Sequence, residues 1–191
     1  MIVRMKEKYQ KEVVPALMKE FGLENKMQVP VIEKVVINAG VGKILNSVDP
    51  SQKPKILEAM VKDLAMIAGQ KPVVVSSRIA VAAFKLRKGM PVGLKVTLRG
   101  QRMYDFLDRL VHIALPRLRD FKGLDLRLFD KDGNLNIGFR EHAIFPEVTP
   151  DKLVFGLEVT IVVKRAKNKE QAIELFRMLG FPLKKEKSSK K

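Results

Sequence analysis

The sequence predicts an α+β fold, in which a mostly antiparallel β-sheet carries helices on one face and leaves its other face open. Segments with the two-residue alternation of strands are interspersed with segments that have the three- and four-residue spacing of helices. At 191 residues with 46% hydrophobic side chains, the chain can bury a substantial core. Neither a linker nor a repeat divides it, so we expect one domain over residues 1–183 and a flexible basic tail over 184–191.

Four segments have the apolar spacing of a helix. They cover residues 3–21 before Gly22, a stretch from Asp49 to Gly69, residues 101–115, and residues 168–179 before Gly180. The glycines are expected to end their helices, because glycine readily takes the left-handed conformation that follows a helix. Asp49, Pro50 and Gln52 have the order of a cap, a first helical residue and a capping-box partner, so we expect the second helix to begin there.

Other segments alternate with a period of two and predict strands. They are residues 28–42, a hairpin over 81–99 that turns at 88–91, a second hairpin over 124–140, and residues 153–164. In the first hairpin the side chains expected to face the core are Ala82, Phe84, Leu86, Val92, Leu94, Val96 and Leu98. Those expected to face outward are Lys85, Arg87, Gly93, Lys95, Thr97 and Arg99.

The most biased part of the chain runs from Leu64 to Tyr104, where 41 consecutive residues include no Asp or Glu. The average acid content of the chain would place about four or five acids there. The same stretch holds eight basic residues, namely Lys71, Arg78, Lys85, Arg87, Lys88, Lys95, Arg99 and Arg102. A cationic sheet face without competing carboxylates favours a polyanionic ligand, of which nucleic acid is the commonest.

The predicted register of the first hairpin strengthens this interpretation. If strands 81–87 and 92–99 pair with matching faces, either Lys85 or Arg87 lies opposite Lys95. Like charges directly opposite in a ladder are mildly destabilising, so folding alone gives no reason for the pattern, whereas phosphate oxygens between the strands would relieve it. No helix carries a basic stripe for the DNA major groove, and few aromatics are available for base stacking. A folded RNA gripped by shape and phosphates fits the open face best.

Other signals for chemistry are weak. The glycines of residues 40–43 fail both the P-loop and the dinucleotide-binding spacing. Residues 130–141 match some positions of a calcium loop but have Leu135 where that loop needs glycine, so an Asp-Gly turn is the better interpretation. Two isolated histidines, His112 and His142, and the absence of cysteine predict neither a metal site nor a catalytic group. We therefore expect no enzyme activity, no cofactor and no small-molecule substrate.

The chain also lacks the sequence features of a membrane protein. No apolar run approaches the roughly 18 residues that a spanning helix needs, and charges are scattered through the first twenty-one residues. We expect no membrane partner and a cytoplasmic location.

Five ordered segments make a family resemblance recognisable. They are MQVPVIEKVVINAGVG, GQKPVVVSSRIAVAAFKLRKGMPVGLKVTLRG, ALPRLRDFKGL, NLNIGFREHAIFPEV and GLEVTIVVKRAKNKEQAIELFRMLGFP. Over about residues 3 to 183 the chain resembles large-subunit ribosomal protein five, bacterial type. The resemblance implies a structural ribosomal protein that binds 5S rRNA and helps attach it to the central protuberance of the large subunit. It further implies contacts with large-subunit rRNA, with other 5S-associated proteins, with P-site tRNA and with a small-subunit head protein.

The resemblance also implies site residues. It places the 5S rRNA contact on Asn38, on Gln70 of the Gly-Gln-Lys-Pro segment, and on Thr97 and Arg99. We add Lys71, the basic residue next to Gln70, to the expected contacts. Lys85, Arg87 and Lys95 are added because they share the same predicted face.

Residues 76–82 resemble the family's tRNA-contacting loop, with Ser76, Ser77 and Arg78 as the contacts. This loop has fewer basic and hydroxyl residues than the family usually shows, so Arg78 is the main candidate. Residues 163–165 depart from the family pattern as well, because Val163-Lys164-Arg165 replaces a run that often carries threonines.

Three other classes remain as alternatives. An RNA-processing enzyme would need a convergent catalytic group. A DNA-compacting protein would bind duplex DNA as tightly as 5S rRNA. A peripheral membrane protein would use the helix of residues 3–21, whose mixed charge argues against it.

Overall fold

The computed structural model describes residues 4–84, 86–119, 121–148 and 153–184, which belong to two compact units. The first unit comprises residues Met1–Val35, Arg99–Ile137 and Thr160–Lys191, and the second comprises Val36–Leu98 and Gly138–Val159. The predicted tail over 185–191 lies outside the described residues.

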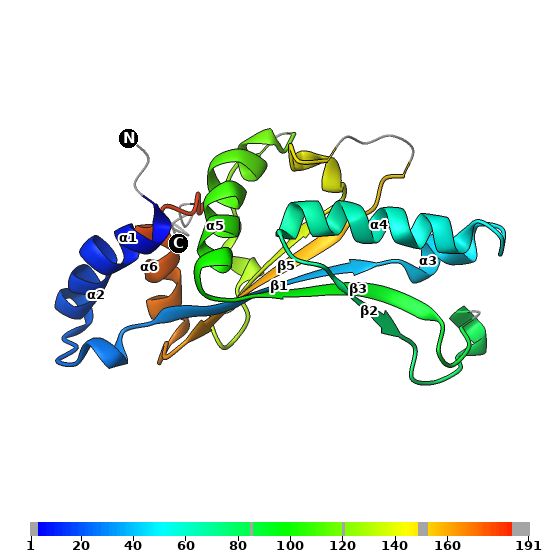
Figure 1. Ribbon diagram of the computed structural model, residues 1–191. Coiled ribbons are helices and arrows are strands. Elements are labelled where there is room, and N and C mark those ends of the chain that lie inside the picture. Colours follow the sequence, from blue (N-terminus) through cyan, green and yellow to red (C-terminus); the bar gives the residue numbers. More distant parts are fainter. Residues whose placement is uncertain (1–3, 85, 120, 149–152, 185–191) are drawn as a thin grey trace, which may run out of the picture. The chain divides into compact units, whose positions relative to one another are not determined.

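A five-stranded antiparallel sheet confirms the predicted α+β class (Figure 1). Its order is β2 (Val73–Ser76), β3 (Pro91–Leu98), β1 (Val31–Gly40), β5 (Leu157–Lys164) and β4 (Leu135–Phe139). β1, β4 and β5 contribute residues to both units. The predicted alternation is confirmed in β1, where Val35, Ile37 and Ala39 are fully buried and Asn38 is exposed.

The first unit contains three long helical segments. α1 (Met5–Lys8) continues through a π-helical turn, Tyr9–Val13, into α2 (Val14–Phe21), and α5 (Gly100–Arg109) continues through Leu110–Ala114 into Leu115–Arg117. α6 spans Lys169–Leu179. Short 3-10 turns cover Lys26–Gln28 and Leu126–Leu128. The predicted glycine ends are confirmed, since Gly22 and Gly180 have φ of 61° and 98°.

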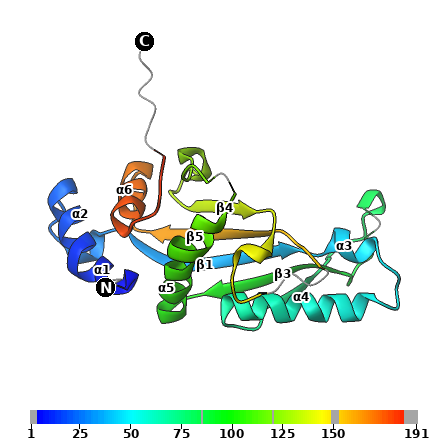
Figure 2. The ribbon, with the colours of Figure 1, turned by 90° about the horizontal axis from the view of Figure 1, so that it is seen from above.

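The second unit contains α3 (Gly42–Asn46), α4 (Lys53–Ala68), and 3-10 turns at Ala82–Phe84 and His142–Ile144. Figure 2 shows α4 running along β3. The helix ends at Gly69 as predicted, but the prediction that it begins at Asp49 is wrong, because residues 49–52 form a turn. Pro54 explains the shift, since proline has no N–H to donate and fits only the first turn of a helix.

The predicted pairing of residues 81–87 with 92–99 is also wrong. The partner of β3 is β2, with Val73 opposite Lys95, Val74 opposite Leu94 and Val75 opposite Gly93. All four β2 residues are exposed, so neither face of this edge strand imposes the alternation by which a half-buried strand is recognised. Within 81–87, only Val81 and Leu86 are described as forming a bridge, with N–O distances of 3.0 and 3.1 Å.

The predicted hairpin over 124–140 is formed only in part. Phe129 and Leu135 make a single bridge, and the residues before Phe129 form a 3-10 turn instead of a strand. The turn itself is confirmed: Gly133 has φ of 81°, and the Asp130 carboxylate accepts hydrogen bonds from the Asp132 and Asn134 backbone N–H groups.

A buried histidine joins the elements of the second unit. His142 is fully buried, stacks on Phe155 with ring centroids 4.0 Å apart, and accepts a hydrogen bond at Nδ1 from the Phe155 N–H at 3.4 Å. Its Nε2 lies 3.7 Å from an Asp63 carboxylate oxygen on α4. Burial lowers the pKa of His142 below its ordinary 6.5, although the nearby Asp63 charge acts in the opposite direction. The folded chain therefore favours the neutral ring.

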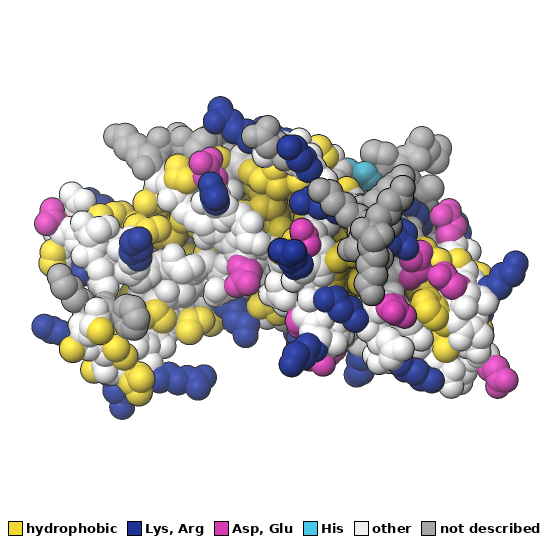
Figure 3. All heavy atoms as spheres, turned by 180° about the vertical axis from the view of Figure 1, so that it is seen from behind, with side chains coloured by type: hydrophobic (Ala, Val, Ile, Leu, Met, Phe, Trp, Pro, Cys, Tyr) yellow, Lys and Arg dark blue, Asp and Glu magenta, His cyan; other side chains and the backbone are white. Residues whose placement is uncertain are grey.

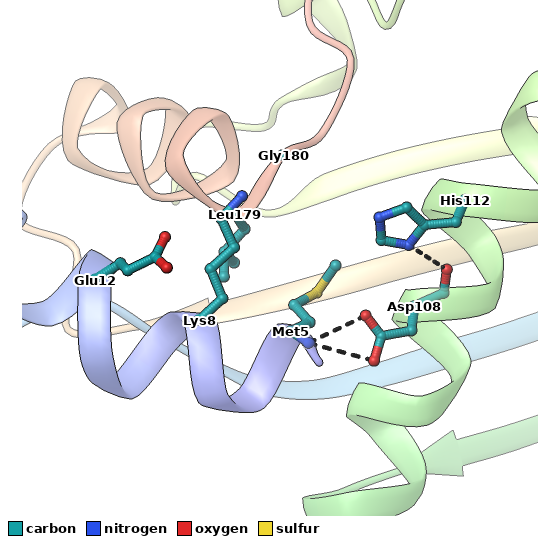
Figure 4. Close-up of a pocket in the computed structure, with 7 residues that line it drawn as sticks. All are labelled: Met5, Lys8, Glu12, Asp108, His112, Leu179 and Gly180. Carbon is teal, nitrogen blue, oxygen red and sulfur yellow. Dashed lines mark hydrogen bonds between the residues drawn. The ribbon is translucent and has the colours of Figure 1, made fainter. Parts of the chain in front are cut away.

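An acidic side chain caps the N-terminal helix of the first unit. Both carboxylate oxygens of Asp108, on α5, accept from the Met5 N–H, at 3.1 and 3.3 Å, while the His112 ring lies 2.9 Å from the Asp108 carbonyl (Figure 4). These residues line a cavity of about 280 Å³ together with Lys8, Glu12, Leu179 and Gly180. Burial raises the pKa of Asp108. The carboxylate accepts a hydrogen bond from an N–H in the first turn of a helix, which has no acceptor within the helix. Asp108 therefore has a structural role.

We expect the stability of the chain to fall as the pH drops below 6.5. Because the folded-state pKa of His142 is lowered, its contribution is fully present above 6.5 and is lost as the pH falls from 6.5 through the folded-state value. Urea denaturation at several pH values between neutral and mildly acidic would measure the fall. His142→Phe keeps the ring stack but cannot titrate, so its stability should depend less on pH. Parallel curves for the two proteins would contradict this role.

We also expect Asp108→Ala to lower the free energy of unfolding by about 1 kcal/mol, because it removes the cap of the helix that begins at Met5. Asp108→Asn keeps one acceptor oxygen and should lose less. Asp105→Ala is the matched control, since that exposed acid on the same helix accepts a surface bond from Gln101 and, among the described residues, no hydrogen bond from the helix that begins at Met5. Thermal or chemical denaturation would compare the three variants, and equal losses for Asp108→Ala and Asp105→Ala would contradict the capping role.

Candidate nucleic-acid interface

The open face of the sheet in the second unit presents neutral hydrogen-bonding groups. On β1, Asn38 is exposed between the buried Ile37 and Ala39. On the adjacent β3, Lys95 is exposed and Thr97 half-buried, while Leu94, Val96 and Leu98 are buried. The sequence predicts these orientations correctly, and strand alternation brings the Asn38 amide and the Thr97 hydroxyl onto one face.

Gly93 lies beside the Asn38 side chain. A Cβ placed on Gly93 would lie 3.7 Å from Asn38 Oδ1 and 3.5 Å from the Ala39 carbonyl oxygen. Gly93 is buried although it belongs to the outward-facing set of β3. Both are ordinary van der Waals distances, so these contacts do not require glycine at position 93.

The charge pattern of this face differs from the prediction. Lys95 lies opposite Val73, which is 67% exposed, and not opposite a second cation. Arg87 lies in no strand, and Lys85 lies outside the described residues. Glu158 on β5 is exposed between two buried neighbours. The argument from like charges paired across a ladder therefore fails, because the residue opposite Lys95 on β2 is apolar.

The cations gather instead on the connection between β2 and β3. The ladder continues beyond the strands through hydrogen bonds from the Ser77 N–H to the Met90 carbonyl and from the Gly89 N–H to the Ser77 carbonyl, at 2.8 and 2.9 Å. Arg78, Arg87 and Lys88 are exposed on this closed tip. Ile79 is 67% exposed, and the Ser77 hydroxyl donates to its carbonyl at 2.6 Å. Basic and hydrophobic side chains mix at this tip, at the lower left of Figure 3.

The remaining predicted residues flank these strands. Gln70 is half-buried and Lys71 exposed, directly after the left-handed Gly69 that ends α4 and before β2 begins. Ser76 is exposed at the end of β2. Arg99 is exposed just after β3, where it precedes α5 and belongs to the first unit. The structure thus gathers the predicted residues from 38 to 97 into the second unit, apart from Lys85.

Sequence reasoning missed the strand that borders this surface. Val73, Val74 and Val75 are 67, 41 and 39% exposed on the edge strand β2. The available signal was three consecutive β-branched residues, which favour a strand even without alternation. With Ile79, they give the candidate interface an apolar component that the charge pattern alone did not reveal.

Within the described ranges, no group of three or more His, Asp or Glu side chains could hold a metal ion. None of the helices described is long and apolar enough to cross a membrane.

Comparison with known proteins identifies the family. Residues 25–87 match the family model of ribosomal protein L5, and residues 91–183 match the model of the C-terminus of the same ribosomal family. The large ribosomal subunit protein uL5 of Thermoanaerobacter sp. (strain X514) is 54% identical over 184 residues, which cover 95% of this chain and 99% of the relative. Its counterpart in Chloroflexus aurantiacus (strain ATCC 29366 / DSM 635 / J-10-fl) is also 54% identical over 184 residues, with coverages of 95% and 98%. That of Syntrophomonas wolfei is 50% identical over 183 residues, with coverages of 95% and 99%.

Proposed function

The chain belongs to the ribosomal protein L5 family and is a structural protein of the large ribosomal subunit, not an enzyme, and on this premise we propose that it binds 5S rRNA through its second unit. In this proposal the protein helps attach 5S rRNA to the central protuberance. The observation that carries it is the common open face of Asn38, Lys95 and Thr97, which adjacent strands of one unit present together.

The chemistry of this face suits a folded RNA. An exposed amide and a hydroxyl can bond ribose hydroxyls or base edges, and the 2′-hydroxyl distinguishes RNA from DNA at such a site. Lys95, Lys71 and the cations of the 77–90 tip supply phosphate contacts, whose counterion release favours binding at low salt. The 41-residue stretch without Asp or Glu leaves no carboxylate on β2, on β3 or on the described residues between them to repel phosphates.

The tip between β2 and β3 supports a second part of the proposal, contact with P-site tRNA. Ser76 and Arg78 are exposed, and Ser77 is also placed on this tip. The exposed Ile79 beside Arg78 adds an apolar surface that can pack against ribose. Contacts with large-subunit rRNA, other 5S-associated proteins and a small-subunit head protein complete the proposed set of partners, and they rest on the family resemblance.

A filter-binding titration against 5S rRNA, a scrambled RNA of equal length and duplex DNA over a salt series tests the proposal. We expect 5S rRNA to bind at least about tenfold more tightly than either competitor at matched salt. Equal affinity for all three would favour a general nucleic-acid-binding protein and contradict the proposal.

Variants on the open face should separate affinity from selectivity. Asn38→Ala and Thr97→Ala remove hydrogen bonds and should reduce the preference for 5S rRNA over scrambled RNA by about 1–3 kcal/mol. Lys95→Gln should weaken all RNAs similarly and reduce the salt slope by about one unit. Lys62→Gln is the matched control, because Lys62 is a cation of the same unit on α4, away from the open face. Equal effects of Lys95→Gln and Lys62→Gln would contradict the assignment of Lys95.

A further inference from the structure

A single non-glycine residue of the described chain has a left-handed backbone. Eight described residues have positive φ; seven are glycines, and the eighth is Arg165, with φ of 70°. Among the residues described, glycine therefore occupies every other position with this conformation, and the exception lies in the turn from β5 to α6. A side chain kept in an unfavourable backbone conformation points to a function for that side chain.

The neighbours of Arg165 are also cations. Lys164, Arg165 and Lys167 are all exposed, and residues 159–169 contain no acid. No ion pair involves these three residues in the part of the chain that the structure describes. We call residues 164–167 the basic turn. Three exposed cations within four residues, without a carboxylate among them, favour an anionic ligand.

Hydrogen bonds hold the basic turn at both ends. The Val163 N–H donates to Asn134 Oδ1 at 3.0 Å, and the Lys167 N–H donates to Oε1 of the buried Gln171 at 2.9 Å. Lys169, just beyond, donates from Nζ to the Phe129 carbonyl at 2.9 Å. The backbone of the turn is therefore fixed before any ligand binds, which lowers the entropy cost of ordering it.

The surroundings favour RNA over an acidic protein. The Arg165 guanidinium lies against the thioether of Met27, with Nη1 4.0 Å from Sδ, and the adjacent Lys26 is exposed. An interface with a protein partner would be expected to bury an apolar centre. Among the residues described, however, Met27 is the only large hydrophobic residue beside this turn that is more than a third exposed. Separate cations on a rigid backbone suit phosphates spaced along an RNA strand.

We propose that the basic turn is a second RNA-binding site, in the first unit, that contacts backbone phosphates of double-helical rRNA without reading its sequence. It contains none of the residues assigned above to 5S rRNA, and it does not depend on that assignment. Residues 163–165 replace a run that often carries threonines in the family. Through this replacement the basic turn gains Lys164 and Arg165, two of its three cations.

The test uses the full chain and a plain RNA duplex without loops, measured by fluorescence anisotropy over a salt series. The triple variant Lys164→Gln, Arg165→Gly, Lys167→Gln should reduce the salt slope by about two to three units and weaken binding about tenfold or more at moderate salt. Its matched control is Lys11→Gln, Lys19→Gln, Lys131→Gln, which removes three exposed cations of the same unit and should change binding much less. Equal losses in the two triples, or no loss in the first, would overturn the proposal.

Two single variants separate a binding role from a structural one. Arg165→Gly suits the left-handed backbone and should keep or raise the thermal stability while weakening duplex binding, whereas Arg165→Lys should keep most of the affinity. A loss of stability in Arg165→Gly with unchanged RNA affinity would assign Arg165 to packing and overturn the proposal. The proposal would equally be overturned if the basic turn bound a polyglutamate peptide and not the duplex. Failure of the 5S rRNA titration would leave these outcomes unaffected, because the probe and the variants differ.

Discussion

The pairing of β2 with β3 is the constraint on which the candidate interface depends. Its register places Val73 opposite Lys95, and it closes the 77–90 connection into a tip by continuing the ladder through Ser77, Gly89 and Met90. The outward face of β3 is fixed by the strand itself, because Leu94, Val96 and Leu98 are buried and turning the strand over would expose them. The core-facing leucines and valines of β3 thus also orient the groups proposed to meet RNA.

This arrangement changes how the surface is expected to bind. The sheet face offers an amide, a hydroxyl and one lysine. Most of the exposed cations of the candidate interface lie on the 77–90 tip and on the residues that flank the two strands. A polar face of this kind provides selectivity through hydrogen bonds, while cations at its margin provide affinity that depends on salt. The exposed valines of β2 add apolar contact area beside Lys95. An exposed edge strand can pair with another chain, so a bound RNA that covered β2 would also prevent that association.

Sequence periodicity predicted well the strands and helices that bury one face, and it predicted poorly the edge strand that is exposed on both faces. Val35, Ile37 and Ala39 alternate because one face of β1 meets a core, and the glycines after α2, α4 and α6 follow from the geometry of helix ends. β2 has no buried face, so it has no alternation to detect. Residues 81–87 do alternate, yet the pairing described there is limited to Val81 and Leu86, since pairing is decided by competition between segments and not by the pattern of one.

For the same reason, the sequence predicted correctly which side chains of the candidate site face outward from their strands. The orientations of Asn38, Lys95 and Thr97 follow from alternation, whereas the residue opposite Lys95 on β2 depends on register, which one sequence does not reveal. The left-handed Arg165 was equally beyond reach, because nothing in its neighbours requires a positive φ.

Arg165 also shows why backbone geometry adds information that composition lacks. Cations are abundant in a chain of net charge +16, so the presence of one more says little about binding. A cation at a position where this chain otherwise uses glycine is different, since a glycine would suit the turn without strain. The hydrogen bonds to Asn134 and Gln171 keep the strained backbone in place, so the side chain is presented at a fixed site whether or not RNA is bound. Arg165 is exposed, and a well-anchored turn holds its backbone in a strained conformation. This combination is the physical reason to propose a ligand for the Arg165 side chain.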